Sequence, residues 1–177
     1  MNQSKINFLI LILSIFTVFV HSSCQQKPQQ VRHLGQEQEV DSSIIAQLQL
    51  NTHLAKLADE ECIKIINNDS TSEYTIDDFG FWYTKIVTSN EDTIQEGEHI
   101  LLHIRINDLN GNLISDTKIH TQLGASDLPI AISRSLKIMR MGEQLRIIAP
   151  WYTAYGVEGT KIIQPYSNLS IILTIEQ

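Results

Sequence analysis

Apolar and polar residues alternate along several stretches of the C-terminal half of the chain, a pattern typical of half-buried β-strands. These stretches are 100–106, 145–149 and 169–175, and the aromatic, β-branched run 81–87 has the composition of a further strand. Asn110-Gly111 marks a hairpin turn. Residues 129–139 carry apolar side chains at helical spacing, and Gly142 follows as a stop signal. The pattern predicts an α+β domain, a mostly antiparallel sheet with one short helix packed on it.

A helical spacing also precedes this region. Apolar side chains in residues 41–66 recur three, four or seven positions apart, which predicts an amphipathic helix. They are Ile44, Leu48, Ala55, Ala58, Cys62 and Ile66. Asp41 or Ser42 can cap the first turn by accepting a backbone N–H. We interpret the apolar face as packing on the chain's own domain; the alternative is a surface for a protein partner.

The start of the chain has the features of a secretory signal peptide. Residues 6–20 carry no charge, and this run is shorter than the roughly twenty residues that a spanning helix needs. Ser22-Ser23-Cys24 resembles the lipobox of bacterial lipoproteins, although an apolar residue is commoner than His21. We expect lipidation at Cys24, with a membrane anchor in the cell envelope and the protein facing the periplasm. A plain signal peptide and an uncut anchor helix are the alternatives.

The segment after Cys24 is polar. It contains repeated Gln with one Pro, one Gly and no aromatic residue, so it cannot bury enough apolar surface to become ordered. The expected organisation is a signal peptide at 1–23, a flexible tether at 24–40, a helix and connector at 41–78, and the α+β domain at 79–177.

Charge and cysteine content exclude several classes of function. The 177 residues include 13 Lys and Arg against 20 Asp and Glu, a net charge of −7. Nucleic acid is therefore not an expected partner, because phosphate binding needs a basic face. The two cysteines, Cys24 and Cys62, cannot form a disulfide framework or a zinc site of four close ligands. We expect no metal and no cofactor.

Common catalytic signatures do not occur in the sequence. There is no G-x-S-x-G and no G-x-G-x-x-G. His99 and His103 would lie about 13 Å apart along a strand, too far to hold one metal ion. The pair Asp77-Asp78 is expected to form a solvated turn without a charged partner. The residues thus show no acid–base machinery.

A series of marker residues, mostly glycines and apolar residues, is spread along residues 95–177. Its members are Gly97, Gly111, Leu123-Gly124, Met139, Met141-Gly142, Pro150, Ala154-Tyr155-Gly156, Ile162-Ile163-Gln164-Pro165 and Leu169. In this order and spacing the segment resembles the FKBP-type peptidyl-prolyl cis-trans isomerases. With the lipobox, the helix and the Phe-Gly-Phe-Trp-Tyr run at 79–83, the chain is similar to the gliding-motility-associated isomerase lipoproteins.

The resemblance implies a five-stranded antiparallel sheet wrapped round one short helix, with an apolar cleft between them. It implies cis–trans rotation of X–Pro bonds in proline-containing polypeptides, with no cofactor. The uncatalysed barrier is about 18–20 kcal/mol. A dry apolar pocket favours the twisted amide of the transition state, which is less polar than the planar amide. This chemistry explains why no acid–base pair is needed.

The resemblance also implies site residues, which match the family only in part. Tyr155 stands at the cleft tyrosine that donates a hydrogen bond to the ligand, and Ile162 and Ile163 stand in the loop over the proline ring. The other pocket positions depart from the family's residues: Ile104, Ile132 and Ile171 replace aromatic residues, Ile114 and Ser115 replace a Phe-Asp pair with Asp116 one place later, and Leu128 and Pro129 precede the helix.

Pro129 is the most consequential of these departures. The family uses a backbone N–H at this position to hold the ligand carbonyl, and proline has none. Two interpretations stay open at this point. The pocket is either aliphatic and dry and isomerises slowly, or it is filled by isoleucine and the domain is a non-catalytic binding or chaperone module.

Overall fold

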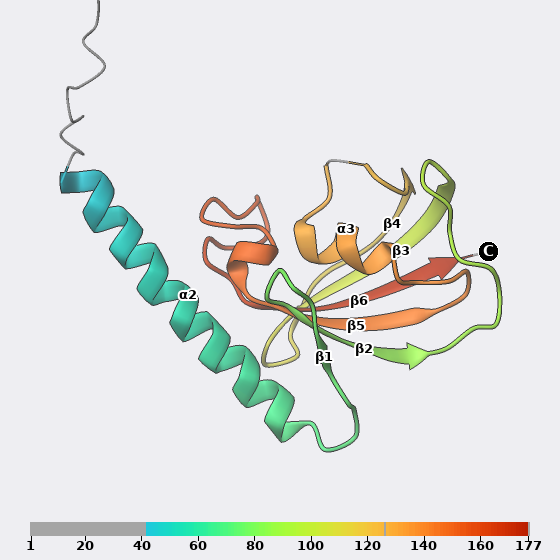
Figure 1. Ribbon diagram of the computed structural model, residues 1–177, viewed down its shortest axis with the longest axis horizontal. Helices are drawn as coiled ribbons and strands as arrows, with labels where there is room; N and C mark the ends of the chain where they lie inside the picture. Colours follow the sequence, from blue (N-terminus) through green and yellow to red (C-terminus); the bar gives the residue numbers. More distant parts are fainter. Residues whose placement is uncertain (1–41, 126, 177) are drawn as a thin grey trace, which may run out of the picture. The chain divides into compact units, whose positions relative to one another are not determined.

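The computed structural model describes residues 42–125 and 127–176 (Figure 1). Its helices are α2 (Ser42–Asn68), α3 (Ile130–Leu136) and the short 3-10 helix η2 (Trp151–Thr153). The strands are β1 (Thr75–Ile76), β2 (Trp82–Val87), β3 (His99–Asp108), β4 (Leu113–Gln122), β5 (Gln144–Ala149) and β6 (Leu169–Glu176). The α+β prediction is confirmed.

All strands form one antiparallel sheet in the order β1-β2-β5-β6-β3-β4. The sheet has six strands rather than five, because the connector before residue 79 contributes the two-residue β1 at one edge. In the central strands, alternate residues such as Leu102, Leu145 and Leu173 are fully buried on the face that α3 covers. We call the opposite side the outer face of the sheet.

The helix α3 is shorter than the predicted 129–139. It ends because the N–H groups of Lys137 and Ile138 donate to carbonyls three residues back, those of Arg134 and Ser135, which tightens the last turn. Ile132 and Leu136 of α3 are both buried against the sheet. This burial places the helix directly over the core.

The long helix α2 packs on the domain through only part of its length. Ala58 and Cys62 are buried, as the apolar spacing predicted, whereas Ile44 and Leu48 are 54% and 61% exposed. The prediction of one continuous packed face is therefore wrong for the start of α2, residues 42–50, all of which are exposed. Packing of the C-terminal half is confirmed.

Polar contacts fix the packed part of α2. The Tyr152 hydroxyl donates to Asp59 at 2.5 Å, the Tyr166 hydroxyl donates to Asn51 at 3.2 Å, and Asn168 donates to Glu61 at 2.6 Å. Among residues 42–125 and 127–176, no helix is long and apolar enough to cross a membrane. The expected signal peptide, Cys24 and the tether lie outside the described residues.

Candidate active site

The described structure gathers the expected pocket residues at the α3 side of the sheet. Ile104 of β3, Ile132 of α3, Ile171 of β6 and Ile163 of the loop before β6 are all buried in one hydrophobic cluster. Three further residues of the expected pocket, Ile114, Leu128 and Tyr155, pack against this cluster and are only partly buried. The structure therefore joins residues from four distant stretches of the chain.

The floor of this site is aliphatic and closed. Ile104 is 5% exposed, and Ile132 and Ile171 have no exposed surface. Ile171 lies opposite Ile106 across the β3–β6 pair, so the strand register places both side chains on the same buried face of the sheet. Only the partly buried residues at the edge present surface to a ligand.

Tyr155 lies in the turn after η2. The N–H of Gly156 donates to the Trp151 carbonyl at 2.8 Å, and the N–H of Gly159 donates to the Tyr155 carbonyl at 3.1 Å. These bonds fix the backbone on both sides of the ring. Burial raises the pKa of the Tyr155 hydroxyl above its usual range. The hydroxyl is therefore protonated at neutral pH and is available as a hydrogen-bond donor.

The loop that carries Ile163 is closed by Thr160. The N–H of Thr160 donates to the Ile163 carbonyl at 2.8 Å, and the Thr160 hydroxyl accepts from the Ile163 N–H at 3.0 Å. Gly159 makes this closure possible, because a Cβ there would lie 2.3 Å from the Ile163 carbonyl oxygen. Within this loop Ile163 is 3% exposed, whereas Ile162 is 63% exposed. Ile163 joins the cluster and Ile162 points to solvent.

Pro129 lies immediately before α3 as its N-cap residue. Its carbonyl accepts the N–H of Ser133 at 2.9 Å, so the residue takes part in starting the helix. Leu128 before it is partly buried against the hydrophobic cluster. The position expected to hold the ligand carbonyl thus carries no N–H.

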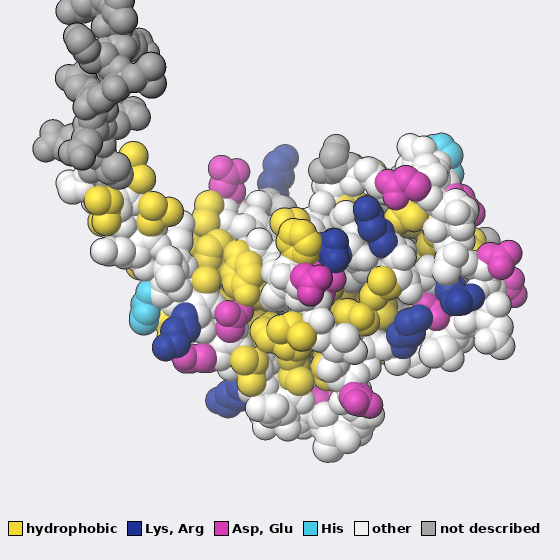
Figure 2. Space-filling model, in the orientation of Figure 1, with side chains coloured by type: hydrophobic (Ala, Val, Ile, Leu, Met, Phe, Trp, Pro, Cys, Tyr) yellow, Lys and Arg dark blue, Asp and Glu magenta, His cyan; other side chains and the backbone are white. Residues whose placement is uncertain are grey.

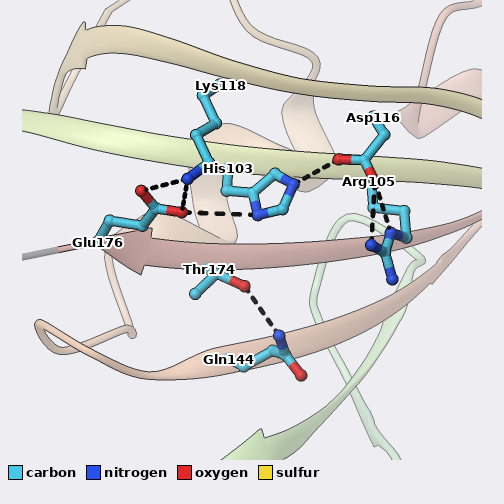
Figure 3. A network of polar contacts seen from close by, with 7 residues as sticks. All are labelled: His103, Arg105, Asp116, Lys118, Gln144, Thr174 and Glu176. Atoms are coloured by element: carbon cyan, nitrogen blue, oxygen red, sulfur yellow. Dashed lines mark hydrogen bonds and ion pairs between the residues drawn. The ribbon is translucent and has the colours of Figure 1, made fainter.

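Asp116 does not belong to this site. It pairs with Arg105 across β3 and β4, and its carboxylate accepts from Arg105 Nε at 3.0 Å and contacts His103 Nε2 (Figure 3). These contacts lie on the outer face, since Ile104 between the two β3 residues is buried on the other side. The bonds to His103 and Arg105 lower the pKa of the Asp116 carboxyl. The expected pocket role of Asp116 is therefore wrong.

The two residues before Asp116, Ile114 and Ser115, lie instead on the core side of β4. Ser115 pairs with Ile106, but the next pair is Leu113 with Asn107, so Ile114 is an extra residue in a β-bulge. Ser115 is half-buried on the face of the buried Ile106, and Ile114 packs against the cluster. A bulge shifts which side chains face the core, and the sequence alone gave no sign of it.

The turn between β1 and β2 also differs from its expectation. Asp77 is not solvated, because its side chain is only 15% exposed. Its two carboxylate oxygens accept from Arg134 Nε of α3, at 3.0 and 3.2 Å. Phe79 of the same turn lies under the Arg134 guanidinium, 4.4 Å from ring centre to the central carbon. No sequence signal pairs residues 57 positions apart, so this cluster beside α3 was missed.

Other candidate chemistry finds no support among the described residues. No group of three His, Cys, Asp or Glu side chains in residues 42–125 and 127–176 could hold a metal ion. Cys62 is a free and fully buried thiol, and burial raises its pKa to about 12. It is therefore not available as a thiolate nucleophile at neutral pH.

Comparisons with known proteins bear on the fold. No protein-family model and no curated protein matches the chain. The solved structure of FkpA from Escherichia coli matches with a TM-score of 0.59 and 14% identity, over 100% of this chain and 82% of that one. A peptidyl-prolyl cis-trans isomerase from Pseudomonas syringae pv. tomato DC3000 matches with a TM-score of 0.58 and 14% identity, over 71% and 93%.

The structure of AtFKBP13 matches as well, with a TM-score of 0.53 and 18% identity, over 58% of this chain and 96% of that one. Each match spans most of the other protein's length. The likeness agrees with the antiparallel sheet, the short helix α3 packed on one of its faces and the apolar cluster between them. This chain therefore has the fold of the FKBP-type peptidyl-prolyl cis-trans isomerases.

Proposed function

We propose that the protein is a peptidyl-prolyl cis-trans isomerase that acts slowly on proline-containing polypeptides. The observation that carries the proposal is Tyr155, a protonated phenol at the edge of an apolar cluster built by α3, the sheet and the loop of Ile163. An X–Pro bond needs no nucleophile to rotate. It needs a dry surface that favours the twisted amide, and a donor that fixes the neighbouring carbonyl.

Different residues would supply the apolar surface and the hydrogen-bond donor. Leu128 and Ile114 offer the partly exposed apolar surface on which a proline ring can lie, and Ile163 supports it from the loop. The Tyr155 hydroxyl donates to a carbonyl of the bound polypeptide. Ile162, which is exposed at the same loop, contacts the part of the ring that faces solvent.

Two features lower the expected rate. Pro129 cannot supply the second donor, and a net hydrogen bond is worth about 0.5–1.5 kcal/mol, or about two- to tenfold in rate. The closed aliphatic floor of Ile104, Ile132 and Ile171 offers no exposed ring for a proline to stack on. We therefore expect activity well below that of a family member with aromatic walls.

The same closed floor favours a second candidate function. If the isoleucines leave too little space for a proline ring, the domain is a non-catalytic binding or chaperone module that uses its partly exposed rim. The two functions predict different results in one assay. The isomerase accelerates a proline-limited step at substoichiometric concentration, and the binding module does not.

A proline-limited refolding assay tests the proposal. We expect the protein to accelerate the slow refolding phase measurably, and Tyr155→Phe to reduce that acceleration about two- to tenfold through the lost donor. Tyr83→Phe is the matched control, because Tyr83 is a half-buried tyrosine on β2 outside the loop of Tyr155. Equal activity in wild type and Tyr155→Phe would contradict the assigned role.

Pro129→Ile restores a backbone N–H before α3. The N-cap residue has a φ of −51° and a ψ of 150°, which an isoleucine can adopt. We expect an increase in activity if this N–H holds the ligand carbonyl. No catalysis by wild type at high enzyme excess, with no rescue by Pro129→Ile, would overturn the isomerase and support the binding module.

We further propose that Cys24 anchors the protein by lipid to a membrane of the cell envelope, with the domain facing the periplasm. Its clients would be envelope proteins, among them components of gliding-motility machinery. The support is the uncharged run 6–20 followed by Ser22-Ser23-Cys24, together with the resemblance of the chain's organisation. Cys24→Ala should abolish labelling by a fatty-acid analogue, and a variant that stays labelled and membrane-bound would contradict the anchor.

A further inference from the structure

The turn between β1 and β2 is rigid and holds an exposed aromatic ring. The Asp77 N–H donates to the Phe81 carbonyl at 2.8 Å, the Gly80 N–H donates to the Asp77 carbonyl at 2.9 Å, and the Phe79 N–H donates to the Asp77 carboxylate at 2.9 Å. Gly80 has a φ of +86°, and a Cβ there would lie 3.0 Å from the Tyr152 hydroxyl. The backbone that carries Phe79 is therefore fixed.

The turn is attached to two elements at once. On one side, the Asp77 carboxylate accepts from Arg134 of α3. On the other side, the Tyr152 hydroxyl of η2 contacts the Gly80 carbonyl at 3.3 Å. Figure 1 shows the β1–β2 connection beside α3 and η2. The helix α3 carries Ile132 of the candidate site, and η2 leads directly to Tyr155, so the turn spans the two elements that position the site.

Phe79 remains half exposed despite this support. Its side chain is 50% exposed, with one face covered by the Arg134 guanidinium at 4.4 Å. Ile130 lies one helical turn before Arg134, on the same side of α3, and is 44% exposed. Figure 2 shows hydrophobic side chains gathered on the face that carries η2, the β1–β2 connection and α3. We call Phe79 and Ile130 the Phe79 shelf.

The chemistry of the shelf selects its ligand. The charge of Arg134 is already paired with Asp77, so the shelf does not favour an anion. A ring whose position is fixed before binding loses little conformational freedom when an apolar group covers it. Leu128 and Pro129 directly precede Ile130 of the shelf along the chain, and Leu128 packs against the hydrophobic cluster of the candidate site.

We propose that the Phe79 shelf binds an apolar side chain of the client polypeptide that lies outside the X–Pro pair itself. The inference rests on the proposed function, because the proline bound at the candidate site sets where the rest of the client runs. The turn would then extend recognition beyond the dipeptide, and polypeptides with a suitably spaced apolar residue would bind more tightly than shorter or more polar ones.

A peptide scan with the full-length protein in detergent micelles tests the inference. The probes are fluorescent octapeptides with a central Ala-Pro and otherwise polar residues, in which one Leu or Phe is moved through the other positions. We expect one position to tighten binding about three- to tenfold by fluorescence anisotropy. Phe79→Ala should remove this preference, while Ile76→Ala should keep it. Ile76 is a matched control, since it is 61% exposed on β1 of the same hairpin.

Photo-crosslinking locates the contact without relying on catalysis. A benzophenone amino acid at the preferred peptide position should crosslink to the tryptic fragment 65–85, which contains Phe79. The preference and the crosslink support the shelf even if no isomerisation is accelerated, in which case the isomerase proposal alone falls. An unchanged preference in Phe79→Ala, or crosslinks only outside 65–85 and α3, would overturn the shelf even in an active isomerase.

Discussion

Gly159 controls the loop that delivers Ile163 to the candidate site, and its replacement by alanine is the sharpest perturbation the structure offers. Gly159 has a φ of +63°, and an added Cβ would meet the Ile163 carbonyl oxygen at 2.3 Å and the Pro165 nitrogen at 2.8 Å. All atoms in the way belong to the backbone. The loop must therefore move by a large fraction of an ångström to admit a methyl group.

The expected loss of unfolding free energy in Gly159→Ala has two contributions. A left-handed backbone costs a non-glycine residue about 1–2 kcal/mol. Moving the loop weakens the two hydrogen bonds between Thr160 and Ile163, each worth about 0.5–1.5 kcal/mol. Gly156→Ala isolates the first part, because Gly156 has a φ of +70° and no atom within 4 Å of its added Cβ. We expect Gly159→Ala to be less stable than Gly156→Ala by about 1–3 kcal/mol.

Urea unfolding of both variants measures this difference as a change in midpoint at constant slope. Gly159→Ala should also lose isomerase activity at temperatures where it remains folded, since Ile163 leaves the cluster. Equal unfolding free energies in the two alanine variants would refute the assigned geometry of the loop. A Gly159→Ala that is less stable, as expected, but keeps full activity would refute the role of Ile163.

Two further predictions concern polar contacts of α2 and the residues that follow it. Bonds from the Thr71 hydroxyl and N–H lower the pKa of Asp69 to about 2. In urea unfolding, the excess unfolding free energy of wild type over Asp69→Asn should therefore be constant above about pH 5, and it should be lost as the pH falls through about 2. A constant difference down to pH 2 would contradict this. Tyr152→Phe removes the hydroxyl donor to Asp59 at 2.5 Å and should cost about 1.5–3 kcal/mol of unfolding free energy. Unchanged hydrogen exchange in α2 of this variant would show that the contact does not hold the helix.

The sequence predicted the fold class because the burial of strands and of α3 follows simple periods. Alternation along β3, β5 and β6 matched the buried face, and Ile132 lies at the helical position that points to the sheet. The edge strand β1 was missed because two residues carry no measurable period. Its pairing depends on β2, which is a tertiary contact.

Most residues of the candidate site could be predicted from the sequence, but the face of the sheet to which each side chain points could be predicted only in part. Tyr155 and Ile163 were found through the resemblance of Ala154-Tyr155-Gly156 and Ile162-Ile163-Gln164-Pro165 to the isomerase family. Asp116 was misplaced because its side depends on its pairing with the outward-facing Arg105 of β3, a tertiary contact that the sequence does not show. The contact between Asp77 and Arg134 joins two elements far apart in sequence, and only the folded chain brings their charges together.

The proposed function requires that a domain of FKBP fold with a closed aliphatic floor still rotates X–Pro bonds. Exchange NMR spectroscopy of a short proline peptide measures this directly, because cis and trans signals exchange magnetisation only when rotation becomes faster than the uncatalysed seconds to minutes. We predict exchange cross-peaks at substoichiometric protein, weakened in Tyr155→Phe and retained in Tyr83→Phe. Peptide binding without any exchange cross-peak, at protein concentrations up to that of the peptide, would contradict the proposed function.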